Sequence, residues 1–129
     1  MKKSKVGNLF IPVGLHPEKH ELATADVFRE LGQDVEFLTP VRTKGAKTPD
    51  VKIDSVVYEL KCPMGHSKTT IANAIRRAVK QSKNVIIDLR LTKISDERAE
   101  KDLQISIAKV KSLRRVKVIL KSGKVLDLK

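Results

Sequence analysis

The stretch TPDVKIDSVVYELKCP, residues 48–63, predicts two strands joined by a tight turn. Residues 50–54 and 56–61 are short apolar runs bounded by turn residues, which is typical of a hairpin. Asp54 and Ser55 stand between the runs and are common turn residues. The second run reads as core, yet it carries Glu59 and Lys61. These two charges are the feature that folding alone does not explain.

The predicted hairpin brings three charged side chains together. Side chains two residues apart in a strand point to the same face, so Glu59 and Lys61 project together. The turn also places Asp50, at the start of the first strand, near the end of the second. Magnesium binds carboxylates together with water and phosphate oxygens. The hairpin therefore predicts a Mg²⁺ site at Asp50 and Glu59, with the main-chain carbonyl of Leu60 as a further ligand.

A metal at this position would suit the hydrolysis of a phosphodiester. It would polarise the scissile phosphate and lower the pKa of a bound water. Lys61 would orient that water or neutralise charge that grows on the phosphate. A simpler interpretation makes Asp50 a turn residue and Glu59–Lys61 an exposed ion pair, a common arrangement on protein surfaces. The residues of the hairpin alone leave both interpretations open.

The composition predicts one globular domain with a nucleic-acid-binding surface. The chain has 129 residues, 40% of them hydrophobic, and a net charge of +12. Such a surface attracts polyanions, of which nucleic acid is the commonest, although an anionic membrane or an acidic protein would fit the same charge. The single cysteine, Cys62, excludes an internal disulfide and a cysteine-built zinc site. No stretch has the pattern of a signal peptide or a membrane span, so a cytoplasmic setting is expected.

Outside the hairpin, the sequence predicts three helices and further strands. Residues 1–15 form an N-terminal strap or edge strand, and residues 39–50 form a loop of a length that is often functional. The expected helices span 17–32, 67–82 and 95–113, and the expected strands span 34–38, 84–89, 116–120 and 124–128. This order predicts a single α/β domain over residues 1–129, with a central mixed β-sheet flanked by helices.

The region after the hairpin is strongly basic. Residues 61–93 hold eight lysines and arginines and a single acid, Asp88. Basic side chains at helical spacing suit backbone phosphates, which supply affinity without sequence information. The four aromatic residues offer no stacking platform, which favours a folded RNA or a duplex as the ligand. The expected substrate contacts are Arg76, Lys80 and Gln81 at the second helix, Lys44 and Lys47 in the loop before the hairpin, and His20 in the first helix.

Two patterns carry a family resemblance. Pro49-Asp50 followed by Glu59-Leu60-Lys61 resembles the signature of the PD-(D/E)XK nuclease superfamily, in which a preceding helix contributes a glutamate; Glu21 stands at that place. A longer series of blocks resembles the C-terminal tRNase domain of CdiA-type contact-dependent growth-inhibition toxins. The blocks are HELATADVFRELGQDVEFL, RTKGAKTPDV, YELKCP, SKTTIANAIRRAVKQSKNVIIDL and GKVLDL.

The resemblance implies a fold, an activity and partners. It implies a PD-(D/E)XK-like domain that cleaves tRNA with Mg²⁺, or with another divalent cation such as Mn²⁺ or Zn²⁺, and a cognate immunity protein. It implies Glu21, Asp50, Glu59 and Lys61 as the catalytic set, the three acids also being metal ligands, and action in the cytosol of the producing or target bacterial cell. The chain would be an excised toxin domain or a free-standing homologue from a mobile element. Two alternatives are a resolvase- or restriction-like DNA endonuclease and a non-catalytic nucleic-acid-binding module on the same fold.

Overall fold

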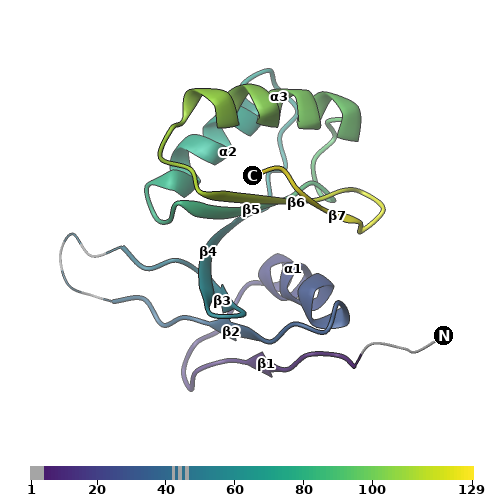
Figure 1. The fold of residues 1–129 in the computed structure, drawn as a ribbon. Coiled ribbons are helices and arrows are strands. Elements are labelled where there is room, and N and C mark those ends of the chain that lie inside the picture. Colours follow the sequence, from purple (N-terminus) through teal and green to yellow (C-terminus); the bar gives the residue numbers. More distant parts are fainter. Residues whose placement is uncertain (1–4, 42, 44, 46) are drawn as a thin grey trace.

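The strands form one mixed sheet whose spatial order is the order along the chain, β1 to β7 (Figure 1). The computed structural model describes residues 5–41, 43, 45 and 47–129, and within them it contains seven strands and three helices. The elements are β1 (Leu9–Phe10), α1 (Lys19–Glu30), β2 (Val35–Phe37), β3 (Val51–Ile53), β4 (Val56–Lys61), α2 (Thr70–Val79), β5 (Asn84–Asp88), α3 (Asp96–Lys109), β6 (Arg115–Ile119) and β7 (Val125–Asp127). The prediction of a mixed α/β fold is confirmed.

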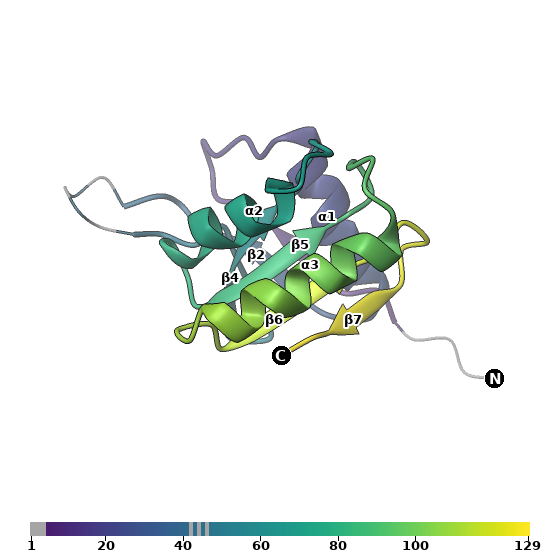
Figure 2. The same ribbon diagram turned by 90° about the horizontal axis from the view of Figure 1, so that it is seen from above.

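The sheet has an antiparallel part and a parallel part. β1 pairs with β2 in parallel, and β2, β3 and β4 form an antiparallel meander. β4, β5 and β6 run parallel, and β7 returns antiparallel to β6. Parallel neighbours need a crossover, which α1 provides between β1 and β2, α2 between β4 and β5, and α3 between β5 and β6. α2 and α3 cover one face of the sheet and α1 covers the other (Figures 1 and 2).

Each face of the sheet has its own apolar core. On the α1 face, Ala25 and Phe28 pack with strand residues that include Val35, Tyr58 and Leu60. On the other face, α2 and α3 pack against Val85, Ile87, Val116 and Val118, among others. Tyr58 and Leu60 therefore point toward α1, and the strand period turns Glu59 and Lys61 toward α2.

The turn of the β3–β4 hairpin is confirmed. Asp54 and Ser55 have φ angles of 47° and 71°. Two consecutive residues with positive φ are the mark of a type I′ turn, whose twist suits an antiparallel pair. The pairing of Ile53 with Val56 and of Val51 with Tyr58 follows from this two-residue connection.

Two predicted helix starts are wrong, for the same physical reason. The first helix was expected to include Pro17, but Glu18 is the N-cap and forms a capping box with Glu21. The second was expected from residue 67, but the hydroxyl of Thr70 accepts a hydrogen bond from the amide of Ser67, 3.0 Å away. Both bonds satisfy a backbone amide that lies before the first helical residue, and the capping box thereby fixes the helix start at Lys19.

The third helix begins as predicted, with the hydroxyl of Ser95 accepting a hydrogen bond from the amide of Arg98. It ends at Lys109, before residue 113. Within the described residues, none of the helices combines the length and apolar character that crossing a membrane requires.

Candidate functional site

Asp50 holds the backbone on both sides of Glu59. Its amide donates to the carbonyl of Tyr58 at 3.1 Å, and its carboxylate oxygen Oδ2 accepts from the amide of Leu60 at 2.9 Å. The hairpin therefore fixes Asp50 beside Glu59, as the sequence predicts. The bond from Leu60 also sets the orientation of the Asp50 carboxylate.

Glu59 is buried, and one of its oxygens lacks a partner. The residue is 6% exposed. Its Oε2 lies 3.6 Å from Nζ of Lys61, whereas its Oε1 has no hydrogen-bond partner among the described residues. The interpretation of Glu59–Lys61 as an exposed ion pair is therefore wrong, because the carboxylate lies inside. A buried, unpaired carboxylate oxygen is costly unless a cation or a donor completes it.

The surroundings of Glu59 favour its neutral form when no ion is bound. Burial raises the pKa of Glu59 to about 7, and the nearby charge of Asp50 acts in the same direction. The ammonium of Lys61 opposes the shift only in part. Two close carboxylates with one unpartnered oxygen fit a hard divalent cation, since such a cation neutralises both and supplies the missing contact.

The structure does not bring Glu21 into this pair. Glu21 belongs to α1, which packs on the opposite face of the sheet, and its Oε1 accepts a hydrogen bond of 2.7 Å from the amide of Glu18. Among the described residues, no three histidine, cysteine or acidic side chains lie close enough to hold a metal ion. An ion held by Asp50 and Glu59 would complete its shell with water and substrate oxygens, which magnesium commonly does. The ligand role of the Leu60 carbonyl stays a prediction.

A cleft of about 380 Å³, here called the α2 cleft, lies beside Lys61. It is lined by Lys61, Cys62, Pro63, Met64, Gly65, Ser67, Thr70, Asn73, Ala74 and Arg77. Arg77 thus shares a cleft with Lys61, and the sequence analysis did not single it out. Its spacing from Thr70 and Asn73, at seven and four residues, is the signal that places all three on one helix face.

None of the other predicted substrate contacts that the structure describes is among the residues that line this cleft. Arg76 and Lys80 are exposed on α2 and at its end, and Gln81 follows them on the surface. Lys47 is exposed in the segment that leads into the hairpin, whereas Lys44 lies outside the described residues. The described parts of that segment project away from the sheet (Figure 1). Their roles in binding stay predictions.

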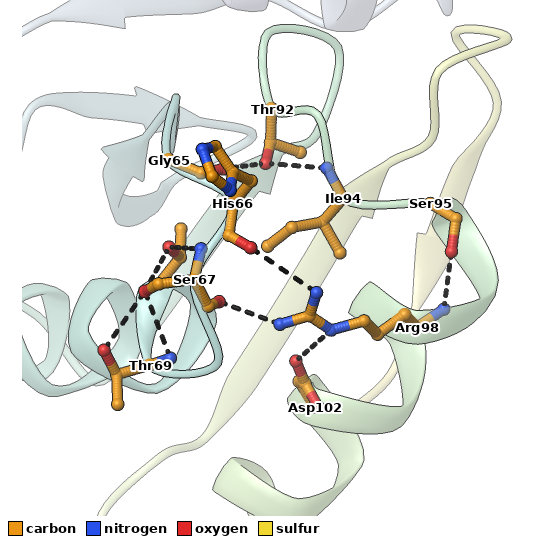
Figure 3. A network of polar contacts seen from close by, with 10 residues as sticks. Gly65, His66, Ser67, Thr69, Thr92, Ile94, Ser95, Arg98 and Asp102 are labelled. Carbon is orange, nitrogen blue, oxygen red and sulfur yellow. Dashed lines mark hydrogen bonds and ion pairs between the residues drawn. The ribbon is translucent and has the colours of Figure 1, made fainter.

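Side chains of α3 and of the segment before it bind the loop between β4 and α2 (Figure 3). Nη2 of Arg98 donates to the carbonyl of Ser67 at 2.8 Å, and Nη1 donates to the carbonyl of His66 at 3.4 Å. The hydroxyl of Thr92 donates to the carbonyl of Gly65 at 2.6 Å. Three consecutive carbonyls of the loop are therefore fixed by side chains from outside it. This loop forms one wall of the α2 cleft.

We expect Arg98→Met to loosen this wall without unfolding the protein. The variant removes charged hydrogen bonds to two carbonyls and should lower the free energy of unfolding by about 1–2 kcal/mol. Amide hydrogen exchange at Ser67 should accelerate relative to the wild type. Lys101→Met is the matched control, because Lys101 is exposed on the same helix. Equal exchange rates at Ser67 in both variants would contradict the role given to Arg98.

Comparisons with known proteins identify a family and a solved structure of the same fold. The family model described as the contact-dependent growth inhibition CdiA C-terminal domain matches residues 47–125, which include the hairpin and α2. A solved structure, a CdiA-CT/CdiI toxin and immunity complex from Burkholderia pseudomallei, shares the fold with a TM-score of 0.68 and 21% identity over 95% of this chain and 99% of that chain. The search of curated proteins found no match. Because the family model covers more than half of the chain, the chain belongs to the family of contact-dependent growth inhibition CdiA C-terminal domains.

Proposed function

We propose that this chain is a metal-dependent endonuclease that cleaves RNA, with tRNA as its substrate. The observation that carries the proposal is Glu59, which is buried beside Asp50 and Lys61 with Oε1 unpartnered. A binding surface gains nothing from a buried carboxylate and a half-buried one next to the path of a polyanion, since they repel it. A hydrolytic site needs them, because they hold the ion that offsets the charge of the phosphate.

Asp50, Glu59 and Lys61 would have different roles in the proposed reaction. A divalent cation, Mg²⁺ or alternatively Mn²⁺ or Zn²⁺, would supply Lewis-acid activation of the phosphate and of a water molecule. Asp50 and Glu59 would hold the ion, with the Asp50 carboxylate kept in place by the Leu60 amide. Lys61, on the same face as Glu59, would place its ammonium against the phosphate and stabilise the charge that develops there.

The choice of RNA rests on charge and family. The net charge of +12 suits a polyanion, and Lys61 and Arg77 bring two cations to the α2 cleft. Family membership supports action as a toxin in contact-dependent growth inhibition, inside the cytosol of a bacterial cell. The related fold was solved as a toxin and immunity complex, which supports a cognate immunity protein as partner. The PD-(D/E)XK assignment belongs to the same proposal, as the order Asp50, Glu59, Lys61 matches that motif.

The experiment compares two substrates under two conditions. Purified protein is incubated with total tRNA and with plasmid DNA, each in magnesium and in EDTA, and the products are separated on gels. We expect discrete tRNA fragments in magnesium, intact tRNA in EDTA and intact plasmid in both. Cleavage of the plasmid instead would favour a DNA endonuclease of the resolvase or restriction type. Binding of either substrate without cleavage in any metal would favour a non-catalytic module.

A further inference from the structure

A second cleft, here called the α1 cleft, lies between α1 and the end of β5. Its volume is about 420 Å³, and it is lined by Lys19, His20, Ala23, Cys62, Asp88, Arg90 and Leu91. Three of these side chains, Lys19, His20 and Arg90, are basic, and the one acid, Asp88, is paired with Arg90. The other three offer apolar surface, and burial raises the pKa of the Cys62 thiol, which keeps it uncharged. The cleft is therefore mainly apolar, with basic side chains among the residues that line it.

The guanidinium of Arg90 is fixed before any ligand arrives. Its Nε donates to Oδ1 of Asp88 at 3.0 Å, and its Nη2 donates to Oδ2 of Asp88 at 2.8 Å and to the carbonyl of Ala23 at 3.1 Å. Asp88 is 3% exposed and also accepts a bond of 2.7 Å from the hydroxyl of Thr24. An arginine held in this way loses little conformational freedom when it binds an anion.

The two clefts meet at the end of one strand. Lys61 lines the α2 cleft, and Cys62, the next residue, lines both clefts. Side chains of consecutive residues in extended chain point to opposite sides. The clefts therefore lie on opposite faces of the sheet at the end of β4, and Cys62 is common to both linings. A nucleic-acid strand that crosses this end can enter both.

We propose that the α1 cleft binds one nucleotide of the RNA substrate next to the cleavage site, with the base among Ala23, Cys62 and Leu91 and a phosphate on Arg90 and Lys19. The assignment rests on the proposed nuclease function and adds a subsite to it. His20, a predicted phosphate contact, lines this cleft and not the α2 cleft.

A nucleotide matches the cleft in both chemistry and size. Its base requires apolar walls and its phosphate requires fixed cations, and the cleft supplies both within a volume typical of small-ligand sites. A bare phosphate would leave the apolar wall unused. To enter the cleft, the base must leave its stack, which is least costly where the RNA is single-stranded. The subsite therefore selects a loop or an unpaired end of the RNA.

The test uses the isolated ligand and needs no catalysis. ¹⁵N-labelled protein carrying Asp50→Asn is titrated in EDTA with each 5′-ribonucleotide, with adenosine and with inorganic phosphate. We expect saturable shifts of the amides around Ala23 and Leu91 for nucleotides, weaker binding of adenosine and the weakest binding of phosphate. Equal affinity for phosphate and nucleotides, or shifts confined to the α2 cleft, would overturn the subsite.

Two variants separate the apolar and cationic sides. Ala23 is exposed on α1, so Ala23→Trp fills the cleft without disturbing the core, and we expect nucleotide affinity to fall on the order of tenfold. Ala108→Trp, at an exposed position of α3, is the control. Lys19→Met should lower the affinity for nucleotides several-fold and leave the affinity for adenosine unchanged, because adenosine has no phosphate. Unaltered nucleotide affinity in Ala23→Trp would place the ligand elsewhere.

The nuclease proposal and the subsite can fail separately. Nucleotide binding in the α1 cleft by a protein that cleaves no RNA would keep the subsite and end the nuclease assignment. RNA cleavage that is unaffected by Ala23→Trp, together with absent nucleotide shifts, would end the subsite and keep the nuclease.

Discussion

Glu59→Gln is expected to abolish RNA cleavage and to leave RNA binding intact. The substitution keeps the size of the side chain and removes the charge that a divalent cation needs. Loss of one such electrostatic contact typically lowers the rate on the order of a hundredfold or more. Single-turnover cleavage of tRNA in magnesium measures the rate, and a binding titration in EDTA measures the affinity. Circular dichroism checks that the fold survives.

Lys61→Met should give the same separation of binding from cleavage. The variant keeps most of the aliphatic stem and removes the ammonium that lies 3.6 Å from Glu59. Lys52→Met is the matched control, because Lys52 belongs to the same hairpin and is exposed beside Glu36. Expression of the wild type should inhibit a bacterial host, whereas the two site variants should be harmless. A folded Glu59→Gln protein that cleaves tRNA at nearly the wild-type rate would end the nuclease assignment.

The second large effect is a loss of stability as the pH rises, in the absence of divalent ions. The pKa of Glu59 is raised from 4.5 to about 7 by burial and by Asp50. Between these values the folded protein holds a proton that the unfolded chain releases, so stability falls as the pH increases. The shift corresponds to about 3 kcal/mol of unfolding free energy, present at the acid end of this range and lost at the other. Urea denaturation in EDTA across the range measures it.

Glu59→Gln is also the control for the pH effect. Its amide does not titrate, so its stability should lack this decline and exceed that of the wild type at neutral pH. Manganese should restore the stability of the wild type and leave the stability of the variant unchanged, since an ion that binds only the folded state stabilises that state. If the unfolding free energies of the two proteins in EDTA changed with pH in the same way, the pKa of Glu59 would not be raised in the folded protein.

The hairpin was predictable because its signals are local. The two-residue turn, the strand period of two and the identity of the charged residues are all contained within residues 50–61. These features are enough to place Asp50 beside Glu59 and to put Lys61 on the same face. These local signals could not predict that Glu59 is buried, since its burial depends on how α2 and the neighbouring strands cover that face.

What the sequence could not place concerns relations between distant segments. Arg77 lines the α2 cleft beside Lys61, whereas the predicted contact at Arg76 stays a prediction. One residue is about 100° around a helix, and only packing on the sheet sets which of the two faces the cleft. Glu21 was expected at the metal pair, but it lies in the first turn of a helix on the other face. Asp88, the single acid of residues 61–93, is the last residue of β5, and its partners include Thr24, which is 64 residues away.

The order of the strands bears on how the chain assembles. Each strand from β2 to β7 pairs with the strand that precedes it in the sequence. No strand has to insert between two that are already paired, so the sheet can grow by adding one strand at a time to a free edge. The β3–β4 hairpin is the most local of these pairings, and local pairings close at the smallest entropic cost. Asp50 and Glu59 can therefore meet early, before β5, which pairs with β4 at Glu59, is in place.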